Sequence, residues 1–203
     1  RRADETGVMR RLPLLLVPLA LSAGCMSGDE PEPVSVDWPG ESDGATEAID
    51  LGAGFSLDAP ASWTLEQAFE LPAGPFDECD SVHASIDAGP GVFVSFALPS
   101  VACAGAADPE PPLNGEHGDY ITVDDVPAPL GTATAPSDLG EVTTFEQDYE
   151  ECTQECVTTR DQVALVALTV PVDPDHPTLM VYGDAEDVPV DRMLALVDAI
   201  SFG

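Results

Sequence analysis

Apolar and polar positions alternate along most of the chain from Glu47 onward, and this pattern predicts β-strands. Successive side chains of a strand point to opposite faces of its sheet, so a strand buried on one face repeats every two residues. The segments with strand character are 48–51, 55–58, 82–87, 92–98, 120–123, 141–149, 157–170 and 178–182. Segment 92–98 is apolar on both faces, which is typical of a central strand lying under two layers.

Two segments carry apolar residues at helical spacing and predict helices, at 64–70 and 189–200. In the first, Leu65, Ala68 and Phe69 share one face. In the second, the inward face consists of Met193, Leu196, Val197 and Ile200. Strands dominate and most turns are short, so the predicted fold class is α+β: a single domain in which a few helices pack on an antiparallel β-sheet.

The N-terminal region has the proportions of an export signal. A positive stretch at 9–11 precedes thirteen mainly apolar residues, 12–24, which end abruptly at Cys25. As a helix these thirteen residues span about 20 Å, less than the roughly 30 Å of a hydrocarbon core, so a secretory signal peptide is favoured over a membrane span. An ordinary cleaved signal with an incidental cysteine is one interpretation of this pattern.

The other interpretation is a lipid anchor, because residues 21–25, LSAGC, resemble the lipobox of bacterial lipoproteins. The resemblance implies that the Cys25 thiol takes a diacylglycerol and that the peptide is cut before it. It also implies a location at the extracytoplasmic face of the bacterial cell membrane. The expected organisation is a lipoprotein signal peptide at 1–24, a lipidated cysteine and disordered acidic tether at 25–46, and a globular α+β domain at 47–203. Trp38 is the one aromatic residue of that tether, and it is either docked on the domain or incidental.

The strong negative charge of the chain limits the classes of partner that it can bind. Without the signal peptide there are 36 acidic residues against two basic ones, Arg160 and Arg192, and no lysine, so the net charge is near −34. Such a surface repels nucleic acid and anionic headgroups. Cationic peptides, metal ions or polycationic surfaces remain as partners, unless the acidity reflects only salt adaptation or base composition.

The four cysteines after Cys25 are expected to form disulfides, because export leads to an oxidising compartment. Four cysteines allow three connectivities. We favour Cys79 with Cys103, which flank a predicted hairpin, and Cys152 with Cys156, which flank a three-residue loop. A zinc site at the second pair is disfavoured, because no histidine stands at ligand spacing.

No catalytic motif is found in the chain. A G-x-S-x-G string, a P-loop and an HExxH motif are all missing from the sequence. Of the three histidines, His83 is expected at the surface or under a helix, His117 in an acidic loop and His176 in a proline-flanked turn. The sequence therefore predicts no catalytic residue and no cofactor.

Calcium is the metal that the acidic loops suit best, because hard oxygen ligands are abundant. The candidate ligands are Asp119, Asp124 and Asp125, or Asp173 and Asp175. No twelve-residue EF-hand loop is present, so solvated acidic loops are favoured and no metal site is predicted.

The strings FSLDAPASW and DRMLALVDAISF, with the strands between them, resemble the PsbP-like sandwich over residues 47–203. The resemblance implies a binding or scaffolding protein and supplies no catalytic residue. The expected function is a membrane-anchored extracytoplasmic lipoprotein with a non-enzymatic binding or envelope-assembly role, whose partner is an envelope protein or a cationic ligand. A secreted carboxylate-based hydrolase and a calcium-dependent adhesion module are the alternatives.

Overall fold

The computed structural model describes residues 36–41, 44–71, 81–101, 120, 122–126, 133–152 and 156–203. At 133–134, 149–152 and 156 it describes the backbone alone. The expected signal peptide and most of the expected tether therefore lie outside the described residues.

Ten strands and one α-helix are found in this part of the chain. The strands are β1 (Thr46–Gly52), β2 (Phe55–Pro60), β3 (Thr64–Gln67), β4 (Val82–Gly89), β5 (Val92–Leu98), β6 (Ala133–Pro136), β7 (Gly140–Cys152), β8 (Cys156–Leu168), β9 (Thr178–Asp184) and β10 (Ile200–Phe202). The helix is α1 (Val190–Asp198), and a short 3₁₀ helix, η2 (Val123–Asp125), precedes β6.

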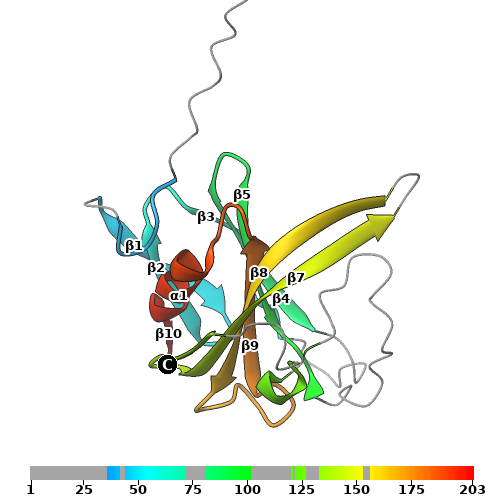
Figure 1. The fold of residues 1–203 in the computed structure, drawn as a ribbon. Helices are drawn as coiled ribbons and strands as arrows, with labels where there is room; N and C mark the ends of the chain where they lie inside the picture. Colours follow the sequence, from blue (N-terminus) through cyan, green and yellow to red (C-terminus); the bar gives the residue numbers. More distant parts are fainter. Residues whose placement is uncertain are drawn as a thin grey trace, which may run out of the picture. The chain divides into compact units, whose positions relative to one another are not determined.

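The strands form two sheets, and every pairing between named strands is antiparallel. One sheet has seven strands in the order β3-β4-β5-β9-β8-β7-β6, and the other has three in the order β1-β2-β10 (Figure 1). β7 and β8 pair from Gly140 opposite Leu168 to Cys152 opposite Cys156, so they form one long hairpin. The prediction of an antiparallel sheet with a helix packed on it is confirmed in this form.

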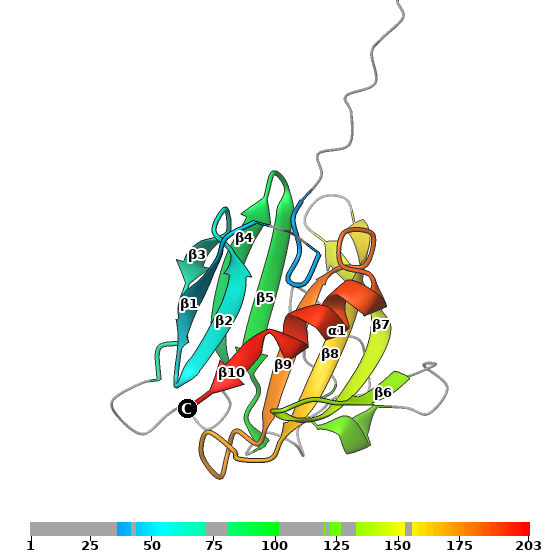
Figure 2. The same ribbon diagram turned by 90° about the vertical axis from the view of Figure 1, so that its left-hand side faces the viewer.

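The three-stranded sheet and α1 lie over one face of the seven-stranded sheet (Figure 2). We call the covered face the inner face and the opposite one the outer face. Both layers contribute to one buried apolar cluster, which includes Ile86, Val94, Phe96, Ala164, Val166, Val181, Leu57, Leu196 and Val197. Because the two layers share this cluster, residues 36–203 form a single folded unit as far as they are described.

The outer face carries a second, smaller apolar cluster made of Ala97, Phe145, Val163, Leu165 and Met180. Tyr120 and Val123, from the segment around η2, pack against it. The Tyr120 ring meets the Phe145 ring edge-on, with 5.3 Å between their centroids. The segment around η2 therefore covers this part of the outer face.

The helix predicted at 64–70 is wrong, because the segment begins with β3 at an edge of the seven-stranded sheet. Leu65 of β3 lies opposite Ile86 of β4, and the Phe69 amide donates a 2.6 Å hydrogen bond to the Leu51 carbonyl. Phe69 itself is buried. A helix this short is marginal on its own, so strand pairing and the burial of Phe69 outweigh the local pattern.

Two other predicted elements differ from the structure, one in its type and one in its length. Segment 120–123 is not a strand where it is described, since Thr122 donates hydrogen bonds from its amide and its hydroxyl to the Asp125 carboxylate and η2 follows. The C-terminal helix is confirmed but ends at Asp198, and Ile200 belongs to β10. One α-helix stands among the described residues, where a few were expected.

Candidate functional site

The buried Trp38 ties the N-terminal segment to the domain. Its side chain is 1% exposed and belongs to the cluster on the inner face. The Trp63 ring meets it edge-on at 5.3 Å, and the Arg192 guanidinium lies 5.1 Å from its ring centroid. The Trp63 Nε1 also donates a 3.0 Å hydrogen bond to the Asp37 carbonyl. Of the two interpretations of Trp38, docking on the domain is the one observed, so the folded unit begins ahead of Glu47.

The predicted anchor cysteine, the two cysteines of one predicted disulfide and one of the three histidines are not among the described residues. These residues are Cys25, Cys79, Cys103 and His117. The backbone of Cys152 lies opposite that of Cys156 at the end of the long hairpin. Residues directly opposite in an antiparallel pair have Cα atoms about 4.5–5.5 Å apart, which is within the range that a disulfide spans. The pairing of these two cysteines stays a prediction.

The buried His176 pairs with the partly exposed Asp173 in the turn between β8 and β9. The His176 Nδ1 lies 2.9 Å and 3.0 Å from the two carboxylate oxygens of Asp173, and the residue is 2% exposed. Desolvation alone raises the pKa of Asp173, but the hydrogen bonds from His176 and from the Asp175 amide bring it below its usual value. A histidine oriented by a carboxylate can serve as a catalytic base, but this ring is too deeply buried to meet a substrate.

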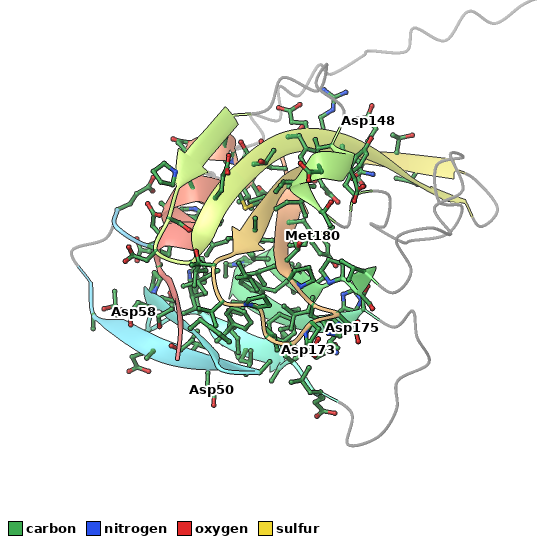
Figure 3. All side chains as sticks on the ribbon, turned by 90° about the horizontal axis from the view of Figure 1, so that it is seen from below. Asp50, Asp58, Asp148, Asp173, Asp175 and Met180 are labelled. Atoms are coloured by element: carbon green, nitrogen blue, oxygen red, sulfur yellow. The ribbon has the colours of Figure 1, made fainter. Side chains whose placement is uncertain are left out.

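The carboxylates proposed for calcium are used within their own turns. Asp173 accepts hydrogen bonds from the amides of Asp175 and His176, and these residues lie at one end of the molecule (Figure 3). Asp125 accepts both hydrogen bonds from Thr122. In the part of the chain that the structure describes, no three potential ligands come together as a metal site. Asp119 lies outside that part.

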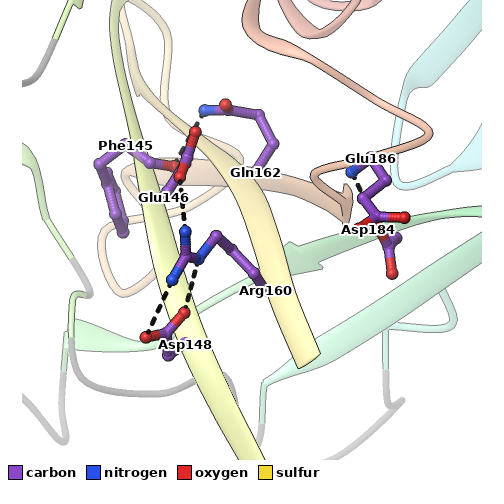
Figure 4. Close-up of polar contacts among 7 residues, drawn as sticks. All are labelled: Phe145, Glu146, Asp148, Arg160, Gln162, Asp184 and Glu186. Carbon is purple, nitrogen blue, oxygen red and sulfur yellow. Dashed lines mark hydrogen bonds and ion pairs between the residues drawn. The ribbon is translucent and has the colours of Figure 1, made fainter. Parts of the chain in front are cut away.

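The ion pair of Arg160 lies on the long hairpin, toward the inner side. Its Nε donates a 2.7 Å hydrogen bond to Asp148, and its Nη1 lies 3.8 Å from Glu146 (Figure 4). The hydrogen bond from Arg160 lowers the pKa of Asp148. Both partners are well exposed, so this pair contributes little to stability.

A row of polar residues crosses the outer face beside an exposed aromatic ring. The register places Gln147 opposite Asp161, Asp161 opposite Asp184, and Phe93 opposite Asp87, and Thr64 continues the row on β3. Ser95 pairs with Tyr182, so Phe93 falls beside Asp184 two positions further along the same strands. The Phe93 side chain is 56% exposed. This row is the strongest candidate for a functional site among the described residues.

Asp161 is the residue of this row whose pKa is shifted from its ordinary value. The residue is 8% exposed, and desolvation, followed by the negative charge of Asp184, raises the pKa of Asp161 to about 6. One carboxyl of the row is therefore more easily protonated than an ordinary aspartate. A carboxyl with a raised pKa is the kind of group from which general acids are built.

His83 lies on the outer face with Ser85 and Asp87, as predicted from strand alternation. Desolvation lowers the pKa of His83 although the residue is exposed at the surface. No described hydrogen bond joins it to a nucleophile, and it lies two residue pairs away from the acidic row. It is not part of the candidate site.

The sequence contained a signal for this row that we did not use. Phe93 shares strand parity with Ser95, and Asp161 lies in a polar stretch, TTRDQ, just before the apolar run of β8. Alternation therefore places both residues on one face of their strands. The register that brings Asp161, Asp184 and Phe93 together is a tertiary property, and no local pattern contains it.

Comparison of the chain with protein families, curated proteins and solved structures finds no match. Among the described residues, no helix is both long enough and apolar enough to cross a membrane.

Proposed function

We propose that the chain is a lipid-anchored protein at the extracytoplasmic face of the bacterial cell membrane, whose folded domain binds a partner without catalysing a reaction. The sequence LSAGC at 21–25 supports the anchor. The observation that carries the proposal is the docking of Trp38, because it attaches the chain to the folded domain thirteen positions after the cysteine.

The length of chain between the anchor and the domain sets the working height of such a protein. Cys25 and Val36 are eleven positions apart, and Val36 packs against the domain close to Gly89. Eleven residues reach at most about 40 Å when fully extended and about 18 Å as a flexible chain. The folded domain would thus act near the membrane surface, where a partner protein of the envelope is within reach.

We also propose that the domain is a variant of the PsbP-like sandwich. The buried Pro60 at the end of β2, the buried Trp63 after it, the antiparallel sheet and the helix near the C-terminus support this. The strand β3 in place of a helix after Trp63 departs from the expected pattern. A binding or scaffolding role is what that resemblance implies.

A carboxylate-based hydrolase is a second candidate, and one observation favours it. Asp161, with its raised pKa, lies opposite the charged Asp184, and Phe93 offers a flat apolar surface beside them. Retaining glycosidases use two carboxyls about 5 Å apart, one as the acid and one as the nucleophile. Hydrolysis of a glycoside panel that is lost in both Asp161→Asn and Asp184→Asn would favour this candidate over the binding protein.

Metabolic labelling with palmitate tests the anchor. We expect the native chain to incorporate label and to partition with membranes, and Cys25→Ala to do neither. The matched control is Cys79→Ala, which should keep its label. Equal labelling of the native chain and Cys25→Ala would contradict the proposal.

A further inference from the structure

The exposed ring of Phe93 is the starting point, because it interrupts a surface that is otherwise polar. Its cross-strand neighbour is Asp87 on one side. On the other side, β5 pairs with β9 from Ser95 to Ala97, and continuing that register by two residues places Phe93 beside Asp184. The backbone of β5 lies close to β9 here, since a Cβ added to Gly183 would stand 3.1 Å from the Phe93 carbonyl. The ring therefore lies between two carboxylates on the same face of the sheet.

Both flanking carboxylates are held in place and keep bonding capacity. One oxygen of Asp87 accepts a 2.9 Å hydrogen bond from the Gly89 amide, and one oxygen of Asp184 accepts a 2.8 Å hydrogen bond from the Glu186 amide (Figure 4). These contacts orient the carboxylates, and a carboxylate has further lone pairs for another donor. An aromatic face flanked by oriented carboxylates attracts a cation through both the ring quadrupole and the charges.

Among the described residues, no arginine or lysine is found at this surface. Only two basic residues follow Cys25, and there is no lysine. Arg160 is bound to Asp148 and Glu146, and Arg192 lies over Trp38. The complementary charge must therefore come from a partner.

We infer that the outer-face surface around Phe93, Asp87 and Asp184 binds an arginine or lysine side chain presented by a peptide segment of a partner protein. Charge complementarity favours this occupant, because the net charge near −34 repels nucleic acid and anionic lipid. A side-chain cation also matches the single exposed ring and the two separate carboxylates. The inference rests on the proposed binding role and names the chemistry of its partner.

Titration of the complete chain with a capped peptide, two arginines between glycines, tests this inference at physiological salt. We expect the resonances of Phe93, Asp87 and Asp184 to shift with one dissociation constant. The same peptide with citrulline in place of arginine keeps its shape and loses its charge, and it should not shift them. Equal shifts with citrulline would overturn the inference.

Substitutions separate a local site from the general attraction of an acidic protein for cations. Phe93→Leu keeps apolar bulk without the aromatic ring and should raise the dissociation constant about threefold. Asp87→Asn should also raise it about threefold. The matched control is Asp50→Asn on β1, because Asp50 likewise accepts a 2.9 Å hydrogen bond from the glycine two residues on.

Asp50 lies on the three-stranded sheet, on the other side of the molecule's core from the outer face (Figure 3). Packed sheets are about 10 Å apart, which exceeds the screening length of about 8 Å at physiological salt. Asp50→Asn should therefore change binding less than about 1.5-fold. Equal weakening by Asp50→Asn and Asp87→Asn would show diffuse attraction only and would overturn the inference.

Two further results separate this inference from its rivals. Calcium that shifts the same resonances at a lower concentration than the peptide would assign the surface to a metal and overturn the inference. Failure of palmitate labelling would remove the anchor and leave the peptide titration intact. Absence of peptide binding in a chain that carries lipid would overturn this inference and leave the proposed anchor intact.

Discussion

The two faces of the seven-stranded sheet differ most clearly along one strand. On β5, Val94 and Phe96 point to the inner face and are 0% exposed, whereas Phe93 points to the outer face and is 56% exposed. Neighbouring residues of similar hydrophobicity thus have opposite environments because a second layer covers only the inner one at this position. Hydrophobicity alone does not tell which side of a strand is covered.

The faces also differ in the charge that they carry. The inner face is apolar where α1 and the three-stranded sheet cover it. The outer face has an apolar part near Met180 and, toward the other end of the same strands, the acidic row with Phe93. The inner face therefore forms the core of the domain, and the described part of the outer face carries the candidate site.

Loss of the Trp38 side chain should have the largest effect on the inner face. Trp38→Ala removes a fully buried ring, and such a change costs about 3–5 kcal/mol of unfolding free energy. Denaturant unfolding measures it. The control is Trp38→Phe, which keeps most of the apolar contact and also removes the Nε1 donor, for which no partner is found among the described residues. A Trp38→Ala variant as stable as the native chain would show that residues 36–41 are not part of the folded unit.

A matched pair of phenylalanines compares the two faces on one strand. Phe96→Ala should lower the free energy of unfolding by about 3–5 kcal/mol, because it leaves a cavity in the core. Phe93→Ala should change it by no more than about 0.5 kcal/mol, because the ring is largely in water already. Similar losses for both variants would contradict the assignment of the two faces.

Asp161→Asn should stabilise the domain at neutral pH. Burial and the charge of Asp184 raise the pKa of Asp161 to about 6 in the folded chain, so ionisation is harder in the folded state than in the unfolded one. The native chain therefore loses stability relative to Asp161→Asn as the pH rises from about 4 to about 6, by about 1–3 kcal/mol. Below about pH 4 the carboxyl is protonated in both states and the two chains should be equally stable in this respect.

Unfolding measured at pH 3.5 and at pH 7 separates this effect from a change in packing. A difference between the two chains that is the same at both values would mean that the carboxyl does not titrate as described. Asp58→Asn, on β2, removes an exposed carboxyl and is the control for a general loss of negative charge.

Arg160→Gln should have the smallest effect, because its ion pair is exposed to solvent. We expect no measurable change in the denaturation midpoint. The pKa of Asp148, followed by NMR, should rise toward its ordinary value when the hydrogen bond from Arg160 is lost. An unchanged pKa of Asp148 would show that the two side chains do not interact in solution.

Local pattern was sufficient for the long strands and the C-terminal helix. β7 was predicted because segment 141–149 alternates, and β8 because segment 157–170 ends in a long apolar run. α1 was predicted because its apolar residues keep helical spacing. β6 and β10 were missed, since four and three residues are too few to show a period. The segment at 64–70 was misassigned because strand pairing at a sheet edge decides its structure.

The candidate site was beyond the reach of local pattern for a different reason. Asp87 faces Phe93 across the predicted hairpin, but Asp184 and Asp161 join them in one row only through the strand order β5-β9-β8. Trp38 was likewise placed in a tether by the composition around it, although its burial depends on contacts with Trp63 and Arg192. Composition describes the solvent preference of a segment and carries no information about a single docked residue.

The most direct test of the binding surface is the NMR shift of the arginine δ-methylene protons in the peptide when it binds. A guanidinium stacked on the Phe93 ring places those protons in the shielding region above it. We expect an upfield shift with the native chain that disappears with Phe93→Leu. An arginine side chain whose bound shift is the same with both chains would contradict the account.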